Sequence, residues 1–119
     1  MTVSADAVVY KICPAALWRR AEAAGTFLGA PVDVTDGFIH FSTAAQVRET
    51  ARRHFAGLGE LKLVTVAVEP LGAALKWEPS RGGHLFPHLY GPLPLSAVRK
   101  VEDLPIRPDG IHVFPPGFP

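Results

Sequence analysis

The chain has 119 residues and one cysteine; 48% of its residues are hydrophobic, 19% are charged, and the formal net charge is +1. These values are typical of one globular domain with its own core. We expect that domain to span residues 1–119, with the core over about 7–104 and a Pro/Gly-rich tail over 105–119. The near-neutral charge argues against nucleic-acid binding, and neither a transmembrane run nor a signal peptide is apparent. We therefore expect a cytoplasmic protein without membrane association.

The first half of the chain is predicted to alternate strands and helices. Pro14 suits the first turn of a helix, Gly25 suits a helix end, and Thr43 followed by Gln46 has the form of a capping box. The predicted elements are a strand over 7–13, a helix over 15–24, a loop over 26–36, a strand over 37–42 and a helix over 43–56.

The second half is predicted to be mostly β. One apolar, β-branched run is typical of a central strand covered on both faces, whereas Pro87 places its strand at an edge or rim. The predicted elements are the central strand over 61–68, a turn over 70–74, a short strand over 74–78, a loop over 80–83, a strand over 85–90, a turn over 92–97 and a strand over 98–104. The predicted fold class is α+β, with two helices packed on a mixed, split β-sheet.

Residues 36–43 (DGFIHFST) form the first motif that suggests chemistry. On a strand, His40 and Ser42 share one face, while Ile39 and Phe41 point to the opposite face and into the core. A histidine and a hydroxyl beside a helix N-terminus make a site that suits an anion or a phosphate. The alternative is structural: the histidine holds a loop carbonyl, and Ser42 caps the helix.

Residues 78–91 form the second motif. Phe86, His88 and Tyr90 share a strand face, where an aromatic ring could stack on a flat ligand. Arg81 carries a guanidinium that suits a phosphate or a carboxylate. Glu78 is expected to orient Arg81 or to act as a general base. A plain surface ion pair between these two residues is the alternative.

A metal site is a further alternative. His40, His84, His88 and Glu78 are residue types that bind zinc, and a metal-dependent hydrolase would use His40, His88 and Glu78. Pro87 and the apolar pattern oppose a helix between His84 and His88, so these two histidines are too far apart to share one metal.

The two motifs together resemble those of the bacterial domain of unknown function 952 family. The matching stretches are 36–47 and 86–91, and residues 9–12 (VYKI) with Trp18 fit the family's first strand and helix. The resemblance covers roughly residues 7–104. That family is distantly similar to the ADP-ribosyltransferase-like superfamily, on the branch of the RNA 2′-phosphotransferases, which use NAD.

The resemblance implies an ADP-ribosyltransferase-like fold with a ligand cleft around two histidines. It makes His40 a contact to the nicotinamide ribose or the pyrophosphate of NAD, a co-substrate. Lys11 lies near the place of the superfamily's first-strand histidine, which grips NAD. Glu78 is the candidate for the superfamily's conserved glutamate, and Arg81 is the candidate for holding phosphate.

We therefore expect an enzyme that transfers an ADP-ribosyl or phosphate group, or a degenerate relative of one. Its expected catalytic residues are His40, His88 and Glu78. The expected ligand-binding residues are Lys11, Ser42, Arg81, Phe86 and Tyr90. The alternatives that stay open are a non-catalytic module that binds a nucleotide or small anion, and the metal-dependent hydrolase. The expected partner is a small molecule or nucleotide, and the expected assembly is a monomer or weak dimer.

Overall fold

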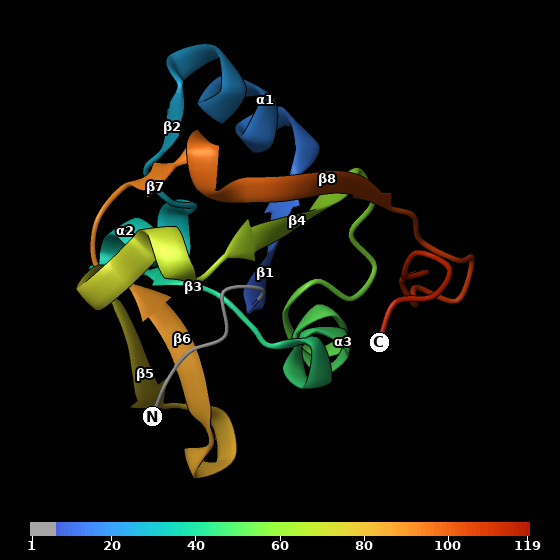
Figure 1. Cartoon of the computed structure of the whole chain (residues 1–119). Helices are drawn as coiled ribbons and strands as arrows, with labels where there is room; N and C mark the ends of the chain where they lie inside the picture. The colour runs from blue at the N-terminus through green and yellow to red at the C-terminus, as the bar shows by residue number, and fades with distance from the viewer. Residues whose placement is uncertain (1–6) are drawn as a thin grey trace.

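The computed structural model describes residues 7–119, and three α-helices lie among eight strands in this part of the chain (Figure 1). The elements in chain order are β1 (Val8–Pro14), α1 (Ala15–Ala24), β2 (Thr26–Phe27), α2 (Pro31–Asp36), β3 (Ile39–His40), α3 (Ala44–His54), β4 (Leu61–Ala67), β5 (Leu75–Pro79), β6 (Leu85–Leu89), β7 (Leu93–Pro94) and β8 (Val98–Leu104). The predicted α+β class is confirmed.

The β-structure is split, as predicted. One three-stranded sheet has the order β1-β4-β8, a second has the order β3-β6-β5, and β2 pairs with β7. The two larger sheets meet where Tyr10 and Ser42 exchange backbone hydrogen bonds of 2.8 and 2.9 Å. Every strand pair among residues 7–119 is antiparallel, whereas we expected mixed strand directions.

Two apolar clusters form the core on opposite faces of β4. Leu61 and Leu63 join the cluster beneath α3, while Val64 and Val66 join the cluster that reaches α1 and the second sheet. Strand β4 is thus central and covered on both faces, which confirms that prediction. No helix in residues 7–119 combines the length and the apolar character that crossing a membrane would require.

Two of the three helices lie where they were predicted. Helix α1 ends at Gly25, whose φ of 83° is in the left-handed region that glycine adopts at little cost. At the start of α3, the Gln46 side chain accepts a hydrogen bond of 3.0 Å from the Thr43 N–H, as the capping box requires. The predicted loop over 26–36 is wrong, because it contains β2 and α2. Pro31 begins α2 rather than breaking the chain.

Strand β6 is the middle strand of its sheet, so the predicted edge position is wrong. Proline is tolerated there because the pairing with β3 stops beside it. The Phe41 N–H donates to the Pro87 carbonyl at 3.0 Å, but Pro87 has no N–H with which to return the bond. Strand β3 accordingly covers only Ile39–His40 instead of the predicted 37–42.

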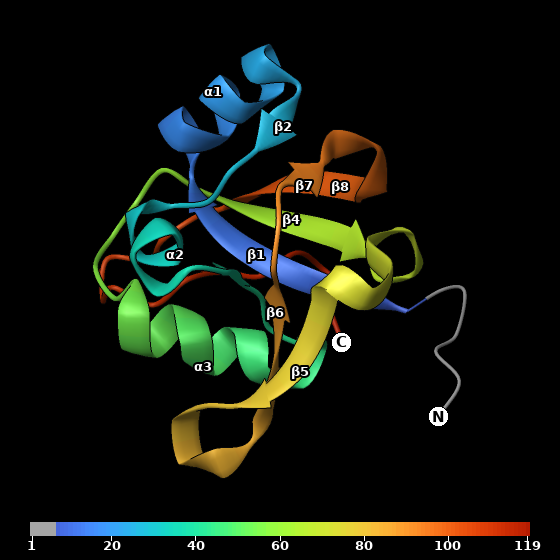
Figure 2. The ribbon, with the colours of Figure 1, turned by 90° about the vertical axis from the view of Figure 1, so that its left-hand side faces the viewer.

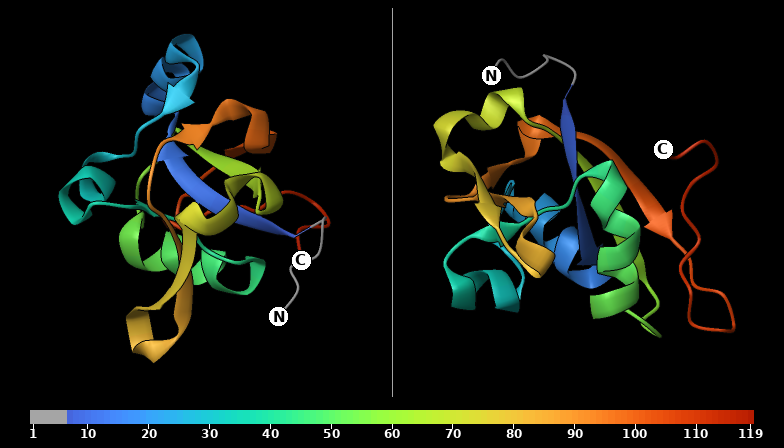
Figure 3. Two further views of the ribbon diagram at one scale, coloured as in Figure 1. Left: turned by 60° about the vertical axis from the view of Figure 1, so that its left-hand side comes forward. Right: turned by 90° about the horizontal axis from the view of Figure 1, so that it is seen from below.

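The segment after β8 folds back over the body of the protein (Figure 3). The Arg48 guanidinium lies 5.0 Å from the ring centroids of both Phe114 and Phe118 and donates to the Phe118 carbonyl at 3.2 Å. The Phe118 ring also contacts Tyr10 of β1, with 4.9 Å between centroids. The tail therefore lies across α3 and covers one face of the first sheet. On another side of the molecule, the β5–β6 hairpin reaches beyond the body (Figure 2).

Candidate functional site

A hollow of about 500 Å³ lies where β1, α2, β3, α3 and the β5–β6 hairpin meet. This volume is within the range of small-molecule sites. Five of its side chains carry basic nitrogen and one carries a carboxylate. The residues that line it are Lys11, Ile12, Val32, Asp36, His40, Phe41, Ser42, Thr50, His54, Phe55, Ser80, Arg81, Phe86 and His88.

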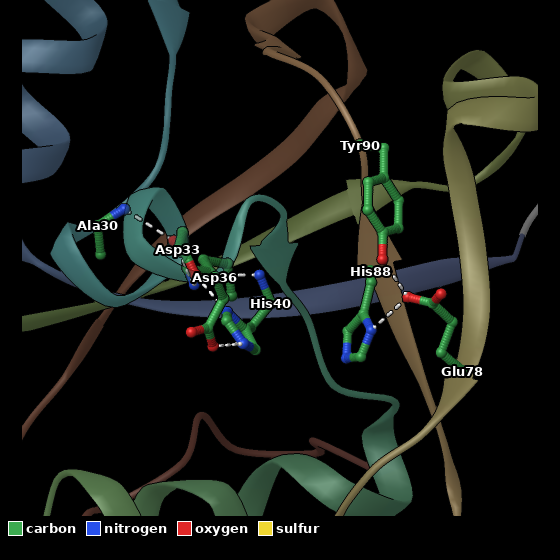
Figure 4. Close-up of polar contacts among 8 residues, drawn as sticks. Ala30, Asp33, Asp36, His40, Glu78, His88 and Tyr90 are labelled. Atoms are coloured by element: carbon green, nitrogen blue, oxygen red, sulfur yellow. Dashed lines mark hydrogen bonds and ion pairs between the residues drawn. The ribbon is translucent and has the colours of Figure 1, made fainter.

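Asp33 organises the polar wall of the hollow from behind. Its carboxylate is 1% exposed and accepts hydrogen bonds from the Ala30 N–H at 2.7 Å, the His40 N–H at 3.1 Å and His40 Nδ1 at 2.6 Å (Figure 4). Lys11 Nζ lies 2.9 Å from its second oxygen. Gly29 permits this arrangement, since a Cβ there would lie 2.8 Å from the Asp33 Cβ.

Asp33 and Lys11 form a buried ion pair in which burial acts differently on each partner. Burial raises the pKa of Asp33, but the His40 hydrogen bond and the Lys11 charge outweigh it and lower that pKa from 3.8 to about 2. Burial lowers the pKa of Lys11, and the attraction of Asp33 offsets this only in part. The Asp33 carboxylate is stabilised by several donors and stays ionised. Its negative charge in turn keeps Lys11 in the ammonium form.

His40 lies between two carboxylates. Nδ1 faces Asp33, and Nε2 is 2.9 Å from an oxygen of Asp36, the last residue of α2 (Figure 4). Both contacts are satisfied together only when both ring nitrogens carry a proton. The two aspartates therefore fix the orientation of the His40 ring.

His88 pairs with Glu78 across the β5–β6 hairpin. His88 Nδ1 donates to Glu78 Oε1 at 2.8 Å, and the same oxygen accepts the Tyr90 hydroxyl at 2.8 Å (Figure 4). Hydrogen bonds from His88 and Tyr90 lower the pKa of Glu78, and the bond to Glu78 raises the pKa of Tyr90. With Nδ1 protonated, the neutral ring presents the Nε2 lone pair on the edge away from Glu78.

The two histidines are direct neighbours across strands β3 and β6. Their ring centroids are 5.5 Å apart. Phe38 stacks on His88 with centroids 4.1 Å apart and an interplanar angle of 22°, and it lies 4.6 Å from His40. It also contacts Tyr90 at 5.3 Å. One aromatic ring thus fixes the orientation of both imidazoles.

Arg81 stands on the opposite wall, in a 3-10 helix over Arg81–Gly83. Its guanidinium lies 4.8 Å from the Phe86 ring centroid, donates to the Thr50 hydroxyl at 3.2 Å and lies 3.8 Å from Glu49. The Thr50 hydroxyl is also 2.9 Å from that of Ser42 and donates to the Gln46 carbonyl. Thr50 therefore links Ser42 to Arg81 and orients the guanidinium.

Six of the predicted site residues line the hollow together: Lys11, His40, Ser42, Arg81, Phe86 and His88. Glu78 and Tyr90 do not line it and act behind His88. The predicted pairing of Glu78 with Arg81 is wrong, since each has other partners. The Arg81 guanidinium covers one face of the Phe86 ring, so that face is not open to a ligand.

Sequence reasoning missed Asp33 and Thr50, and it assigned no role to Asp36 and Phe38, which lie in the first motif. Asp33 and Asp36 fall in the segment assigned to a loop. A short helix that begins at Pro31 would have put these carboxylates, three residues apart, on the same side. Strand alternation puts Phe38 on the same face as His40, whereas no local signal distinguishes Thr50 from an ordinary helix residue.

His40, His88 and Glu78, the expected ligands of the metal-dependent hydrolase, are not arranged around one metal position. Glu78 turns to His88 Nδ1, and His40 is enclosed by its two aspartates. Residues 7–119 contain no group of three His, Cys, Asp or Glu side chains placed to hold a metal ion.

A larger hollow of about 950 Å³ lies between α3 and the tail. Its polar side chains pair with one another or with the tail: Arg52 pairs with Glu49, His112 bonds the Leu58 carbonyl, and Arg48 holds the tail. It offers few convergent polar groups to a ligand, so the smaller hollow is the candidate site.

The family described as protein of unknown function DUF952 matches residues 12–101. A crystal structure of protein CC0527 from Caulobacter crescentus has 48% sequence identity, covers 90% of this chain and 94% of that chain, and gives a TM-score of 0.87. A solution NMR structure of CC0527 has 50% identity, covers 87% and 90%, and gives a TM-score of 0.79. No match was found among curated proteins.

Proposed function

Since this chain belongs to the DUF952 family, whose description assigns no function, we infer its role from the hollow. We propose that the hollow binds a phosphorylated, nucleotide-like ligand and that the protein transfers an ADP-ribosyl or phosphate group. The observation that carries this proposal is the lining. Lys11, His40, His54, Arg81 and His88 converge on one space that contains a single carboxylate, Asp36. These side chains offer N–H donors to an anion, and within residues 7–119 the Arg81 guanidinium among them has no buried carboxylate partner.

The proposed roles follow from the contacts of each side chain. Arg81 holds the phosphate, because Thr50 and Phe86 fix its guanidinium. Lys11 and His40 already face Asp33 and Asp36, so they contribute N–H donors rather than net charge, and Ser42 contributes a hydroxyl. His88 is the acid–base group, and Glu78 orients it and stabilises its protonated form.

The proposed step is a displacement. A hydroxyl of the acceptor gives its proton to His88 Nε2 while its oxygen bonds to the anomeric carbon of a ribose or to the phosphorus of a phosphate ester. When a phosphate ester is the donor, the bond from phosphorus to the ester oxygen breaks, and that oxygen leaves with the electron pair and takes the proton back from His88. When NAD is the donor, the bond from ribose to nicotinamide breaks, and nicotinamide leaves with the electron pair as a neutral molecule. The positive side chains hold the phosphates in place during this step. The ADP-ribosyltransferase-like relationship, and NAD as co-substrate, belong to this proposal.

A non-catalytic binding module is the second candidate. Glu78 is occupied by His88 and Tyr90 and does not line the hollow, so it is not placed to stabilise charge on a ribose. Such a module would bind the same ligands and release them unchanged.

The test is a titration with inorganic phosphate, ADP-ribose and NAD, followed by NMR of the histidine side chains, with nicotinamide release measured by chromatography. Arg81→Ala should weaken phosphate binding at least about tenfold, since a hydrogen bond to a charged group contributes about 1.5–3 kcal/mol. Arg107→Ala is the matched control, because Arg107 pairs with Asp109 away from the hollow. Unchanged His40 and His88 resonances at millimolar concentrations of all three ligands would refute the proposal. Binding without turnover would favour the module.

A further inference from the structure

The two carboxylates that contact His40, those of Asp33 and Asp36, differ in how exposed they are and in how many partners they have. Asp33 is 1% exposed and has donors from three residues. The Asp36 side chain is 42% exposed, and within residues 7–119 its ion-pair partner is His40 Nε2 alone. It is also the last residue of α2, where the helix's final carbonyl groups disfavour a negative charge. Asp33 is a fixed partner, and Asp36 is a replaceable one.

Asp36 and His40 both line the hollow, so the Nε2 of His40 is occupied by the one carboxylate of the lining. An anion that enters the hollow must either leave this contact intact and face the charge of Asp36, or displace Asp36 from Nε2. An exposed ion pair of this kind contributes at most about 1 kcal/mol, so displacement is energetically accessible.

We propose that Asp36 is a specificity-determining residue: it competes with the ligand for His40 Nε2 and makes the hollow select doubly charged phosphate over singly charged anions. The inference rests on the proposed function. A carboxylate ligand that displaces Asp36 from His40 Nε2 brings one negative charge in place of another, and the negative charge of Asp36 remains nearby. A phosphate monoester or a pyrophosphate brings two charges and more acceptor oxygens for the other donors of the hollow.

Asp36→Asn removes the competing charge and keeps the size of the side chain. An ion pair of about 1 kcal/mol converts to about a fivefold change in affinity. Phosphate should therefore bind Asp36→Asn about three- to fivefold more tightly than wild type. Acetate, which we expect wild type to bind too weakly to detect, should bind to the variant measurably. The preference for phosphate over acetate should shrink.

The experiment titrates wild type and Asp36→Asn with inorganic phosphate and with acetate at pH 7.5 and constant ionic strength, following the His40 side-chain resonances. Asp103→Asn is the matched control, because Asp103 pairs with Lys62 and neither residue lines the hollow, so this variant should bind both anions like wild type. Asp36→Ser should repeat the result of Asp36→Asn.

Equal or weaker phosphate binding by Asp36→Asn, or an unchanged preference over acetate, would overturn the inference. If phosphate binding by wild type is lost in Arg81→Ala but unaltered by Asp36→Asn, this inference alone fails. If neither wild type nor Asp36→Asn binds phosphate, the proposed function fails with it.

Discussion

Replacing Asp33 by asparagine tests whether the buried ion pair holds the site together. The substitution keeps the shape of the side chain but leaves the Lys11 ammonium buried without an opposite charge. Breaking a buried pair from one side typically costs about 3–5 kcal/mol, because the remaining charge is neither solvated nor neutralised. We expect a loss in this range for Asp33→Asn in urea unfolding followed by circular dichroism.

The double variant Lys11→Met/Asp33→Asn separates this cost from other effects. It removes both charges, and the new amide oxygen can still accept from either Ala30 or His40, whose donors contact different oxygens of Asp33. We expect it to recover part of the loss, because a buried pair is often replaceable by apolar groups of similar volume. Asp103→Asn breaks an exposed pair with Lys62 and should cost less than about 1 kcal/mol. A double variant no more stable than Asp33→Asn would refute the reasoning.

The pH dependence gives a second readout of the same pair. Asp33 has a pKa of about 2 in the fold and an ordinary value of 3.8, a difference that corresponds to about 2 kcal/mol. The unfolded chain takes up the proton first as the pH falls, so this contribution is complete above about pH 5. It is lost as the pH falls through 3.8 towards 2. The difference in stability between wild type and Asp33→Asn should narrow over that range; a difference that stays constant down to pH 2.5 would contradict the assignment.

Three further predictions concern the rest of the fold. Burial raises the pKa of the Cys13 thiol to about 11, so the native protein should resist a thiol reagent at pH 8 and react only in urea, by mass spectrometry; rapid native labelling would contradict this. Gly25→Ala should cost about 1 kcal/mol in urea unfolding, because the strain lies in φ alone, with no atom near the new Cβ; a neutral result would contradict the cap. Arg48→Ala should speed proteolysis within 105–119, since each of two cation–π contacts contributes about 0.5–1 kcal/mol; unchanged cleavage would show that other contacts hold the tail.

The elements that sequence reasoning placed correctly are those whose ends are set by neighbouring residues. Helix α1 lies between Pro14 and Gly25, and both signals are local. Helix α2 has six residues, too few for an apolar period to emerge, so its turn-forming residues suggested a loop. The position of β6 at the centre of its sheet depends on pairings with distant strands, which the proline could not reveal.

The same distinction explains the site. The two motifs identified His40 and His88, because histidines near strand ends stand out. Their partners were not predictable in the same way. Glu78 is three residues from Arg81 but bonds His88, ten residues away, through the β5–β6 register. Asp33 meets Lys11 across 22 residues, and only the folded chain brings the two together.

The polar groups around the hollow are either buried, like Asp33, or exposed, like Asp36. We expect the buried ones to affect mainly the stability of the fold and the exposed ones to affect mainly ligand binding. Asp33 lies behind the wall, so its substitution changes the free energy of unfolding and, through His40, the site. Asp36 lies at the rim and has little packing to lose, so its substitution should change affinity with a near-constant unfolding midpoint. A pair of variants three residues apart on one short helix thus tests which carboxylate supports the fold and which one selects the ligand.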